Sequence, residues 1–308
     1  MRRVFAIGET VLDIMFKNNI PVSAKPGGSM LNVAVTLGRL NESVYFISEY
    51  GTDQVGDLID DFLVANGVNT KFINRYSEGK SALALAFLDK NQNAAYSFYK
   101  SYPKDRLSIE MPDISQGDIL MFGSFFGIAP EIRPALLKIL TNARESGALV
   151  IYDPNFRKPH LNELDELLPY IKENIQIADI IKGSDEDFKL IFGANSALEA
   201  FEYMSDKRKI LIYTAGKDGA TLVFENQIIQ IAAKQIETVS TVGAGDNFNA
   251  GVAFGLLKND VTLRNIFSIS TLKWKEIVKC GIDFATEVCL SYDNYISSDY
   301  AKNYYLKN

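Results

Sequence analysis

The sequence has little of the chemistry on which several enzyme classes depend. Among 308 residues there are one histidine, two cysteines and one tryptophan. His160 cannot form a zinc site by itself, and no nucleophile elbow accompanies it that would indicate a Ser-His-Asp triad. Cys280 and Cys289 do not have the spacing of metal ligands, so we expect two buried free thiols.

The chain also lacks an excess of positive charge and long apolar runs. Its 32 lysines and arginines are outnumbered by 38 acidic residues, which argues against a broad face for nucleic acid. The apolar run at the start is too short for a signal peptide, and no other stretch approaches the length of a membrane span. With 47% apolar residues, the chain is expected to fold as one globular domain over residues 1–308 and to be cytoplasmic.

What the sequence does have is an alternation of short apolar runs and helical patterns. The runs predict buried parallel strands at 4–8, 44–48, 119–123, 149–152, 180–182 and 210–214. The helical patterns cover 29–40, 55–66, 131–146, 164–174 and 184–192. Together they predict an α/β fold in which helices layer a sheet.

Two stretches depart from this alternation. Residues 11–16 have a strand pattern, and residues 81–88 and 94–99 have the pattern of a hairpin joined by 89–93. We expect these strands to form a small separate sheet, about 11–26 and 81–102, that acts as a lid or a dimer contact. Its aromatic residues could be buried in a symmetric dimer or could simply cover a substrate: Tyr96, Phe98, Tyr99 and Tyr102.

The most informative segment is the turn Gly243-Ala244-Gly245-Asp246, which leads into a helical pattern ending near Leu257. Small residues at a helix start leave backbone N–H groups accessible, and the positive end of the helix dipole favours an anion there. Asp246 adds a carboxylate at the same point. Its alternative role is that of an ordinary helix cap.

Three further polar clusters directly follow strands predicted above. We also predict a strand at 236–239, directly before the glycine turn. Ligands of open α/β sheets bind at the carboxyl ends of strands. The clusters are Asp153–Arg157, Ser184–Asp187 and Thr214–Gly219. Their structural alternatives are a turn, a capping pair of Ser184 with Asp187, and a hairpin turn of Gly216 with Gly219.

Two common nucleotide motifs do not account for these clusters. Gly79-Lys80-Ser81 resembles the end of a Walker loop, but Asn74 stands where that loop needs its first glycine. A dinucleotide fingerprint beginning at Gly243 would place its third glycine at Phe248.

A candidate polyol site lies near the other end of the chain. Gly27 and Gly28 precede a helix on which Asn32 can present an amide to hydroxyl groups. Asp13 supplies a carboxylate that can accept two hydrogen bonds from neighbouring hydroxyls. The alternatives are an ordinary glycine turn and a solvated strand residue.

These motifs resemble the ribokinase-like, or PfkB, carbohydrate kinases over nearly the whole chain. The matching segments are Gly8-Glu9 with Asp13, 27–40, 51–56, 153–157, 214–219 and 243–246. The resemblance implies a three-layer α/β/α sandwich with a mostly parallel central sheet and a small β-sheet lid. Asp-Pro-Asn-Phe-Arg at 153–157 is similar to the fructokinase and 2-keto-3-deoxygluconate kinase branches.

The resemblance also implies roles for individual residues. Asp246 would be the catalytic base, Gly243, Ala244 and Gly245 the anion hole, and Arg157 a contact to phosphate or substrate. Asp13, Gly28 and Asn32 would bind the sugar. The ATP site would include Ser184, Thr214, Gly216 and Gly219, with Asp187 holding Mg²⁺ through water.

Two positions depart from the family pattern. Ser240 stands where the family commonly has aspartate, so the resemblance does not support a monovalent-cation site. The family's Asn-x-x-Glu element appears as Ser184-Asp185-Glu186-Asp187.

We therefore expect transfer of the γ-phosphoryl group of ATP to a hydroxymethyl group of a monosaccharide, with fructose first. 2-Keto-3-deoxygluconate kinase and ribokinase-type activity are the alternatives within the family. An acidic sugar would need a further cation, for which Lys25, Lys100 and Arg106 are candidates. A sugar or nucleotide sensor that kept the fold is the alternative of another class.

Overall fold

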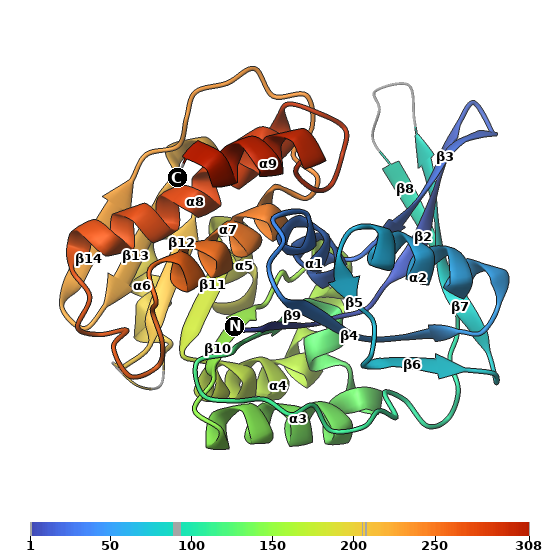
Figure 1. The fold of residues 1–308 in the computed structure, drawn as a ribbon, viewed down its shortest axis with the longest axis horizontal. Coiled ribbons are helices and arrows are strands. Elements are labelled where there is room, and N and C mark those ends of the chain that lie inside the picture. The colour runs from blue at the N-terminus through green and yellow to red at the C-terminus, as the bar shows by residue number, and fades with distance from the viewer. Residues whose placement is uncertain (1, 89–93, 205, 207, 308) are drawn as a thin grey trace.

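A ten-stranded sheet forms the centre of the molecule (Figure 1). The computed structural model describes residues 2–88, 94–204, 206 and 208–307, so the predicted connection 89–93 lies outside the described residues. The strand order is β14-β13-β12-β11-β10-β9-β1-β4-β5, and β6 also pairs with β4. The strands are β1 Val4–Ile7, β4 Val44–Gly51, β5 Val68–Asn69, β6 Ile73–Tyr76, β9 Ile119–Gly123, β10 Leu149–Asp153, β11 Ile180–Ser184, β12 Ile210–Thr214, β13 Ala220–Phe224 and β14 Gln227–Ile231.

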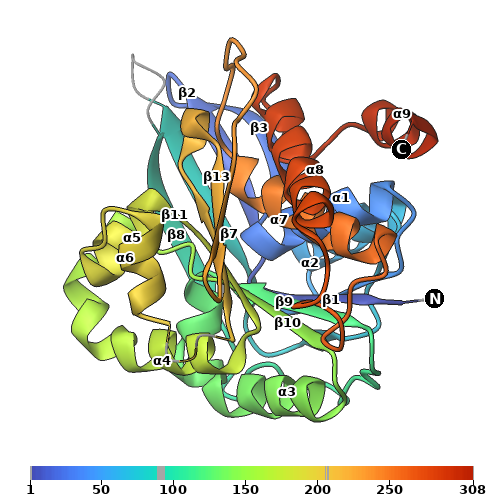
Figure 2. The same cartoon turned by 90° about the vertical axis from the view of Figure 1, so that its left-hand side faces the viewer.

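Helices cover both faces of this sheet, as Figure 2 shows. One face packs against α1 Ser29–Arg39, α2 Gln54–Ala65, α7 Ala244–Lys258, α8 Thr271–Cys289 and α9 Ser298–Lys307. The other packs against α3 Arg133–Glu145, α4 Leu164–Ile177, α5 Asp185–Phe192 and α6 Ala197–Glu202. Short 3₁₀ turns occupy Phe125–Ile128, Pro130–Ile132, Lys158–Glu163 and Gly216–Asp218.

The alternation of side chains along each strand produces two cores. In β1, Val4 and Ala6 belong to the core under α1 and α7, whereas Phe5 and Ile7 belong to the core over α3 and α4. Because successive side chains of a strand point to opposite faces, an uninterrupted apolar run fits a strand buried on both sides. The predicted three-layer α/β/α architecture is confirmed.

A second sheet of four strands projects beside the first, at the upper right of Figure 1. Its order is β3-β2-β7-β8, from β2 Val11–Lys17, β3 Ile20–Gly27, β7 Lys80–Leu88 and β8 Ala94–Ser101. β2 pairs with β3 antiparallel and with β7 parallel, so segments far apart in the chain form one unit. This is the small sheet expected from the strand patterns, and we call it the lid.

The prediction of a strand at 236–239 is wrong. Residues 232–239 form no strand, and the N–H groups of Val239 and Ser240 donate to the carbonyl of Cys289 at the end of α8. Ile236 and Val239 are exposed, so their apolar character does not mark burial in the sheet. The glycine turn nevertheless reaches the carboxyl edge, because β14 is antiparallel to β13 and therefore runs in the direction of β12.

The expectation of two buried thiols is half right. Both cysteines are free, but only Cys280 is buried, and Cys289 at the last turn of α8 is half-buried.

Candidate active site

The glycine turn lies at the start of α7 and packs against the loop that follows α8. Gly243 precedes α7 with a φ of 80°, a left-handed conformation that favours glycine. A Cβ atom at this position would lie 2.7 Å from the carbonyl oxygen of Asn294. Substitution would therefore strain the backbone and displace the neighbouring loop.

The first turn of α7 presents backbone donors to solvent-accessible space. The N–H of Ala244 donates to the carbonyl of Thr241 at 3.2 Å. Within the described part of the chain, the N–H groups of Gly245 and Asp246 have no hydrogen-bond acceptor. Two unpaired donors at the positive end of a helix dipole form a site suited to an anion.

The Asp246 carboxylate lies between α7 and α1. Ser29 Oγ donates to its Oδ1 at 2.6 Å, and Asn32 Nδ2 donates to its Oδ2 at 2.8 Å. The residue is only 9% exposed, and burial raises its pKa, against which the two hydrogen bonds act. Asn32 Oδ1 is buried and has no hydrogen-bond partner in the part of the chain that the structure describes. This oxygen is an acceptor placed beside a carboxylate, where a hydroxyl group would satisfy it.

A buried ion pair lies on the other side of the glycine turn. Lys182 Nζ on β11 is 3.0 Å from Asp153 Oδ2 at the end of β10, and the two side chains are 5% and 2% exposed. Asn249 Nδ2 of α7 donates to the same oxygen at 2.6 Å. Nζ also lies 3.2 Å from the point that a Cβ on Gly245 would occupy. The ammonium group therefore lies beside Gly245, in the space that a side chain at that position would enter.

Acidic neighbours decide the ionisation of this lysine. Burial alone would lower the pKa of Lys182, but the charges of Asp153 and Asp187 hold it above its ordinary value. Burial raises the pKa of Asp187, with the charge of Asp153 acting in the same direction and Lys182 opposing it. Lys182 is consequently a fixed positive charge among buried carboxylates.

Ser184 and Asp187 form the predicted capping pair at the start of α5. Asp187 Oδ2 accepts hydrogen bonds from the N–H and the Oγ of Ser184, each at 2.7 Å. In return, the backbone N–H of Asp187 donates to Ser184 Oγ at 3.1 Å. The other oxygen, Oδ1, accepts from the N–H of Phe156 at 2.7 Å. The pair thus caps a helix and ties two strand-end clusters together.

Thr214, Gly216 and Gly219 lie one strand further along the same edge. Thr214 pairs with Ser184 across β11 and β12, and its Oγ1 donates to the carbonyl of Gly183 at 3.3 Å. Gly216 and Gly219 belong to the turn of the β12–β13 hairpin, which is the structural alternative considered above. The hairpin places them beside Ser184 at the carboxyl edge.

Asp13 faces the main body from the lid. It pairs with Ala84 on β7, which pairs with Phe98 on β8, so these side chains share one face of the lid. Burial raises the pKa of Asp13 to about 6. Burial also raises the pKa of Tyr96, on the same face, and the charges of Asp13 and Arg157 act on it in opposite directions. Arg157 is exposed and lies across from the lid.

The predicted residues thus fall into two groups along one edge of the sheet. In the first group, Asn32 is hydrogen-bonded to Asp246 of the glycine turn. In the second group, Asp187 of the capping pair is hydrogen-bonded to the backbone of Phe156, which lies between Asp153 and Arg157. Gly28 belongs to the first group because it directly precedes α1. Its φ is 140°, and a Cβ atom on it would lie 2.3 Å from the carbonyl oxygen of Glu9.

Sequence reasoning missed Ser29, Lys182 and Asn249. Ser29 was treated only as a helix start, and Asn249 as one small residue of a packed helix. Lys182 stood out as the one charged residue in the apolar run 180–182, and a lysine buried in a strand needs a partner.

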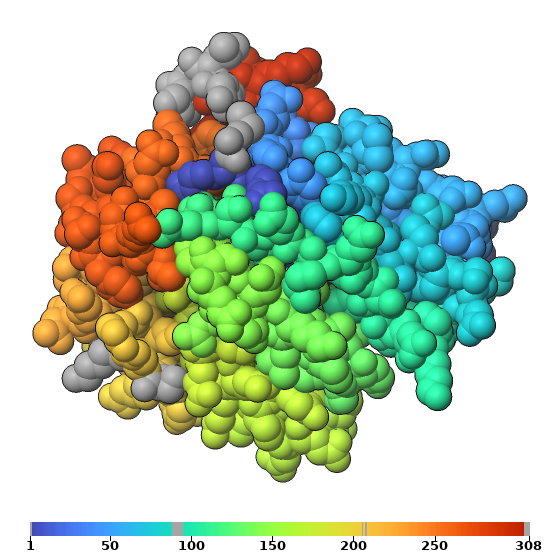
Figure 3. All heavy atoms as spheres, turned by 60° about the horizontal axis from the view of Figure 1, so that its bottom comes forward, coloured from blue at the N-terminus to red at the C-terminus, as the bar shows by residue number. Residues whose placement is uncertain are grey.

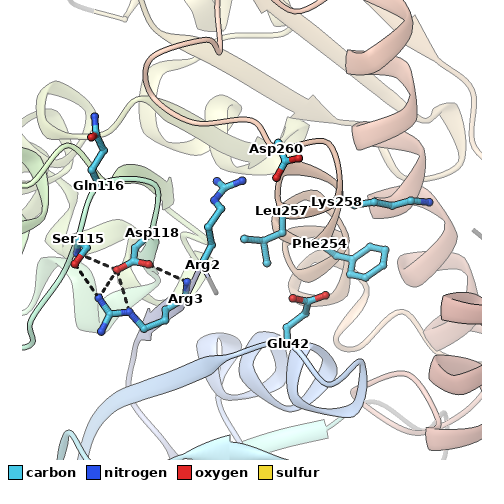
Figure 4. Close-up of a pocket in the computed structure, with 10 residues that line it drawn as sticks. All are labelled: Arg2, Arg3, Glu42, Ser115, Gln116, Asp118, Phe254, Leu257, Lys258 and Asp260. Carbon is cyan, nitrogen blue, oxygen red and sulfur yellow. Dashed lines mark hydrogen bonds and ion pairs between the residues drawn. The ribbon is translucent and has the colours of Figure 1, made fainter.

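A separate cavity of about 1020 Å³ lies at the opposite edge of the sheet. Figure 4 shows Arg2 and Arg3 in it beside Asp118 and the end of α7, and in Figure 3 the dark blue N-terminal residues lie between the green and orange parts of the surface. Arg3 is paired with Asp118 at 2.7 Å, and Arg2 donates to backbone carbonyls. These internal contacts occupy the cations, and none of the strand-end clusters borders this cavity.

Neither a membrane-spanning helix nor a ready-made metal cluster is found among the described residues. No helix there is long and apolar enough to cross a bilayer. No group of three or more His, Cys, Asp or Glu side chains there is arranged to hold a metal ion.

A buried carboxylate next to a helix start that can hold an anion suits the transfer of a phosphoryl group to a small molecule. The family model of the pfkB family carbohydrate kinases matches residues 1–299. The chain belongs to this family and is a sugar kinase.

Named relatives agree with this assignment. Fructokinase-2 from Solanum lycopersicum is 30% identical over 244 residues, which are 77% of this chain and 74% of the relative. Fructokinase from Vibrio cholerae O395, solved with fructose, ADP and calcium, has a TM-score of 0.83 at 22% identity and covers 97% of this chain and 96% of its own. Aminoimidazole riboside kinase from Salmonella enterica, solved with aminoimidazole riboside and an ATP analogue, has a TM-score of 0.82 at 23% identity and covers 99% of this chain and all of its own.

Replacing Lys182 with methionine should destabilise the fold. The change leaves Asp153 buried without its cation, which typically costs about 3–5 kcal/mol of unfolding free energy. Denaturant unfolding followed by circular dichroism measures the loss. The matched control is Lys158→Met, because Lys158 and Glu186 are also 3.0 Å apart but 73% and 57% exposed. That variant should lose no more than about 1 kcal/mol. Equal losses in the two variants would contradict the importance of the buried pair.

Proposed function

We propose that the protein transfers the γ-phosphoryl group of ATP to a hydroxymethyl group of a ketose, with fructose as the first candidate. The observation that carries this proposal is the Asp246 carboxylate held beside both an unpaired acceptor, Asn32 Oδ1, and two unpaired backbone donors. Family membership and the fructokinase names of relatives support the choice of acceptor.

Asp246 is the proposed general base. The acceptor hydroxyl must lose its proton as it attacks phosphorus, and a carboxylate within hydrogen-bond reach can take it. Ser29 and Asn32 hold the carboxylate in one orientation, and a pKa raised by burial strengthens it as a base. Asn32 Oδ1 would accept a hydrogen bond from the sugar at the same point.

The charge of the transferring group would be met by fixed positive groups. The N–H groups of Gly245 and Asp246 in the first turn of α7 have no acceptor among the described residues, and Lys182 Nζ lies 3.2 Å from the point that a Cβ on Gly245 would occupy. Arg157, across from the lid, would add a mobile cation. Prearranged dipoles and charges of this kind stabilise developing negative charge without reorganisation.

Mg²⁺ fits this site as a hydrated companion of the nucleotide. Asp187 Oδ2 already accepts two hydrogen bonds, and its Oδ1 accepts one. A single free acceptor position suits a water of a hydrated cation better than direct coordination, and carboxylates are ligands that Mg²⁺ prefers. When bound, the ion would neutralise phosphate charge, and Asp187 would orient one of its waters.

The remaining predicted residues divide between nucleotide and sugar. Ser184, Thr214, Gly216 and Gly219 would border ATP along the carboxyl edge beyond β11 and β12. Asp13 and Gly28 would bind the sugar, and the lid would exclude water, which competes with the sugar as phosphoryl acceptor. The proposal includes no monovalent-cation site, because Ser240 offers a hydroxyl where the family commonly has a carboxylate.

An assay of catalysis distinguishes the kinase from the rival proposal, a sugar or nucleotide sensor without turnover. Purified protein should release ADP with at least one member of a panel of fructose, ribose and 2-keto-3-deoxygluconate. Asp246→Asn should lower kcat by about 10²–10⁴-fold while sugar and ATP still bind, because it removes only the proton acceptor. Coupled ADP-release assays measure the rates, and calorimetry measures binding.

Asp165→Asn is the matched control for this test. Asp165 is an exposed residue in the first turn of α4, on the opposite face of the sheet, and the variant should retain full activity. A wild-type protein that releases no ADP with any sugar contradicts the kinase proposal. Full activity in Asp246→Asn would rule out the proposed base alone.

Sugar binding should weaken in acid because of Asp13. Its pKa of about 6 means that the carboxylate accepts hydrogen bonds above that pH and is protonated below it. The dissociation constant for the sugar should therefore rise as pH falls through 6, by up to about tenfold per unit. Calorimetric titrations between pH 5 and 8 measure this rise. Asp13→Asn should bind weakly at every pH, and a wild-type constant that does not change with pH would exclude this role.

A homodimer through the lid completes the proposal. The lid face opposite Asp13 is mostly apolar, with Ser97 as a polar member, and its apolar members include Leu12, Ile14, Phe16, Leu83, Leu85, Phe87, Ala95 and Tyr99. Phe87 and Tyr99 are 37% and 59% exposed, so no described residue covers this part of the face, and a second copy would supply a covering layer.

Light scattering should show a dimer that Phe87→Lys converts to monomer, because a charge cannot be buried unpaired in the interface. Leu161→Lys, a change at an exposed leucine outside the lid, should leave the dimer intact. A monomeric wild-type protein would contradict the proposed dimer.

A further inference from the structure

One carboxylate that the proposed reaction does not use lies where the sheet meets the lid. Glu9 follows β1, and its backbone carbonyl lies against Gly28, 2.3 Å from the point that a Cβ there would occupy. An oxygen of the Asp13 carboxylate lies 1.9 Å from the point that a Cβ on Gly27 would occupy. Glu9 is therefore part of the same surroundings as the residues proposed to bind the sugar.

Glu9 binds the one lysine that β8 directs toward this site. Lys100 Nζ is 2.7 Å from Glu9 Oε1 and lies over the ring of Phe98, 5.5 Å from its centroid. Phe98 shares the lid face of Asp13, and alternation along β8 places Lys100 on that face as well. Without Glu9, this ammonium group would be a free cation beside the sugar.

The orientation of Glu9 is held from the other side by a second donor. Tyr102 donates its hydroxyl to the same Oε1, and burial together with the charge of Glu9 raises the pKa of this tyrosine, which keeps it a donor. The guanidinium of Arg106 lies 3.5 Å from the centre of the Tyr102 ring and pairs with the buried Glu49. Glu9 thus belongs to a fixed network and is not a mobile surface residue.

The other cations considered for an acidic sugar are also engaged. Lys25, which pairs with Asp13 across β2 and β3, forms an ion pair with Asp293 at 2.7 Å. Arg106 is taken up by Glu49. The lid side of the site therefore combines neutralised cations with the Asp13 carboxylate, which has no ion-pair partner among the described residues, and this favours hydroxyl donors and disfavours a carboxylate.

We propose that Glu9 sets the charge selectivity of the acceptor site: by neutralising Lys100, it makes the enzyme choose uncharged sugars over sugar acids. The inference rests on the proposed sugar kinase function and deepens it. Glu9 is a positioning residue, because it acts through Lys100 and not on the reacting atoms. Arg157 remains outside this network, and any pull it exerts on an acidic sugar is common to wild type and variants.

The test compares fructose with 2-keto-3-deoxygluconate, which carries a carboxylate, in wild type and Glu9→Gln. The variant keeps the shape of Glu9 but leaves the Lys100 charge uncompensated. The ratio of kcat/KM for the sugar acid to that for fructose should rise about 10- to 100-fold, the scale of one hydrogen bond to a charged group. Calorimetry on the same proteins should show the same change in the ratio of dissociation constants.

Three further variants separate charge from structure. Glu9→Asp keeps the charge and should keep the wild-type ratio. Lys100→Met should not raise the ratio, and Glu9→Gln combined with Lys100→Met should abolish the gain of Glu9→Gln. A purely structural role for Glu9 would affect both sugars alike and leave the ratio unchanged.

An unchanged ratio in Glu9→Gln overturns the inference, as does a wild type that binds the sugar acid more tightly than fructose. The binding ratio decides this even without turnover. Absence of ADP release from a wild type that binds fructose would instead count against the proposed kinase reaction alone.

Discussion

The hydrogen bonds between α1 and Asp246 join the two halves of the candidate site. Ser29 and Asn32 come from the segment that borders the proposed sugar site, whereas Asp246 begins the helix whose N-terminus is suited to phosphate. Both helices are buried along most of their length, so their relative position is fixed by packing on the sheet. A third bond, from Thr36 to Asn247 at 2.5 Å, repeats the connection one turn deeper. The proposed base and the proposed acceptor site therefore keep one geometry, which proximity catalysis requires.

Charge balance is the second constraint on this site. Asp153, Asp187 and Asp246 are all buried, and Lys182 is the cation that acts on each of them. Burying carboxylates is costly unless they are paired or hydrogen-bonded, and here every one of them accepts at least one hydrogen bond. Lys182 Nζ lies 3.2 Å from the point that a Cβ on Gly245 would occupy, so the same charge that stabilises the carboxylates also lies close to the proposed anion site. The stability of the site and its proposed chemistry thus depend on one side chain.

The sequence predicted the fold and much of the site for definite physical reasons. Apolar runs ending in polar clusters indicate parallel strands, and because the carboxyl ends of parallel strands meet at one edge, the sequence predicts that Asp153 and Ser184 lie near each other. The strand at 236–239 was predicted wrongly because apolar residues there are exposed and their backbone binds the end of α8. Lys182 and Ser29 were missed because their partners are 29 and 217 residues away. Such pairings depend on helix and strand packing that local patterns do not encode.

The lid shows how one thin sheet can serve two purposes through simple alternation. Its strands place Asp13, Tyr96 and Lys100 on the face toward the main body, and Leu83, Phe87 and other apolar residues on the opposite face. A sheet without helices has no layer of its own to cover either face. The inner face is completed by contacts to the body, among them Lys100 with Glu9 and Lys25 with Asp293. These ion pairs hold the lid near the site and at the same time remove free cations from it, so the attachment of the lid and the charge of the acceptor site are set by the same residues.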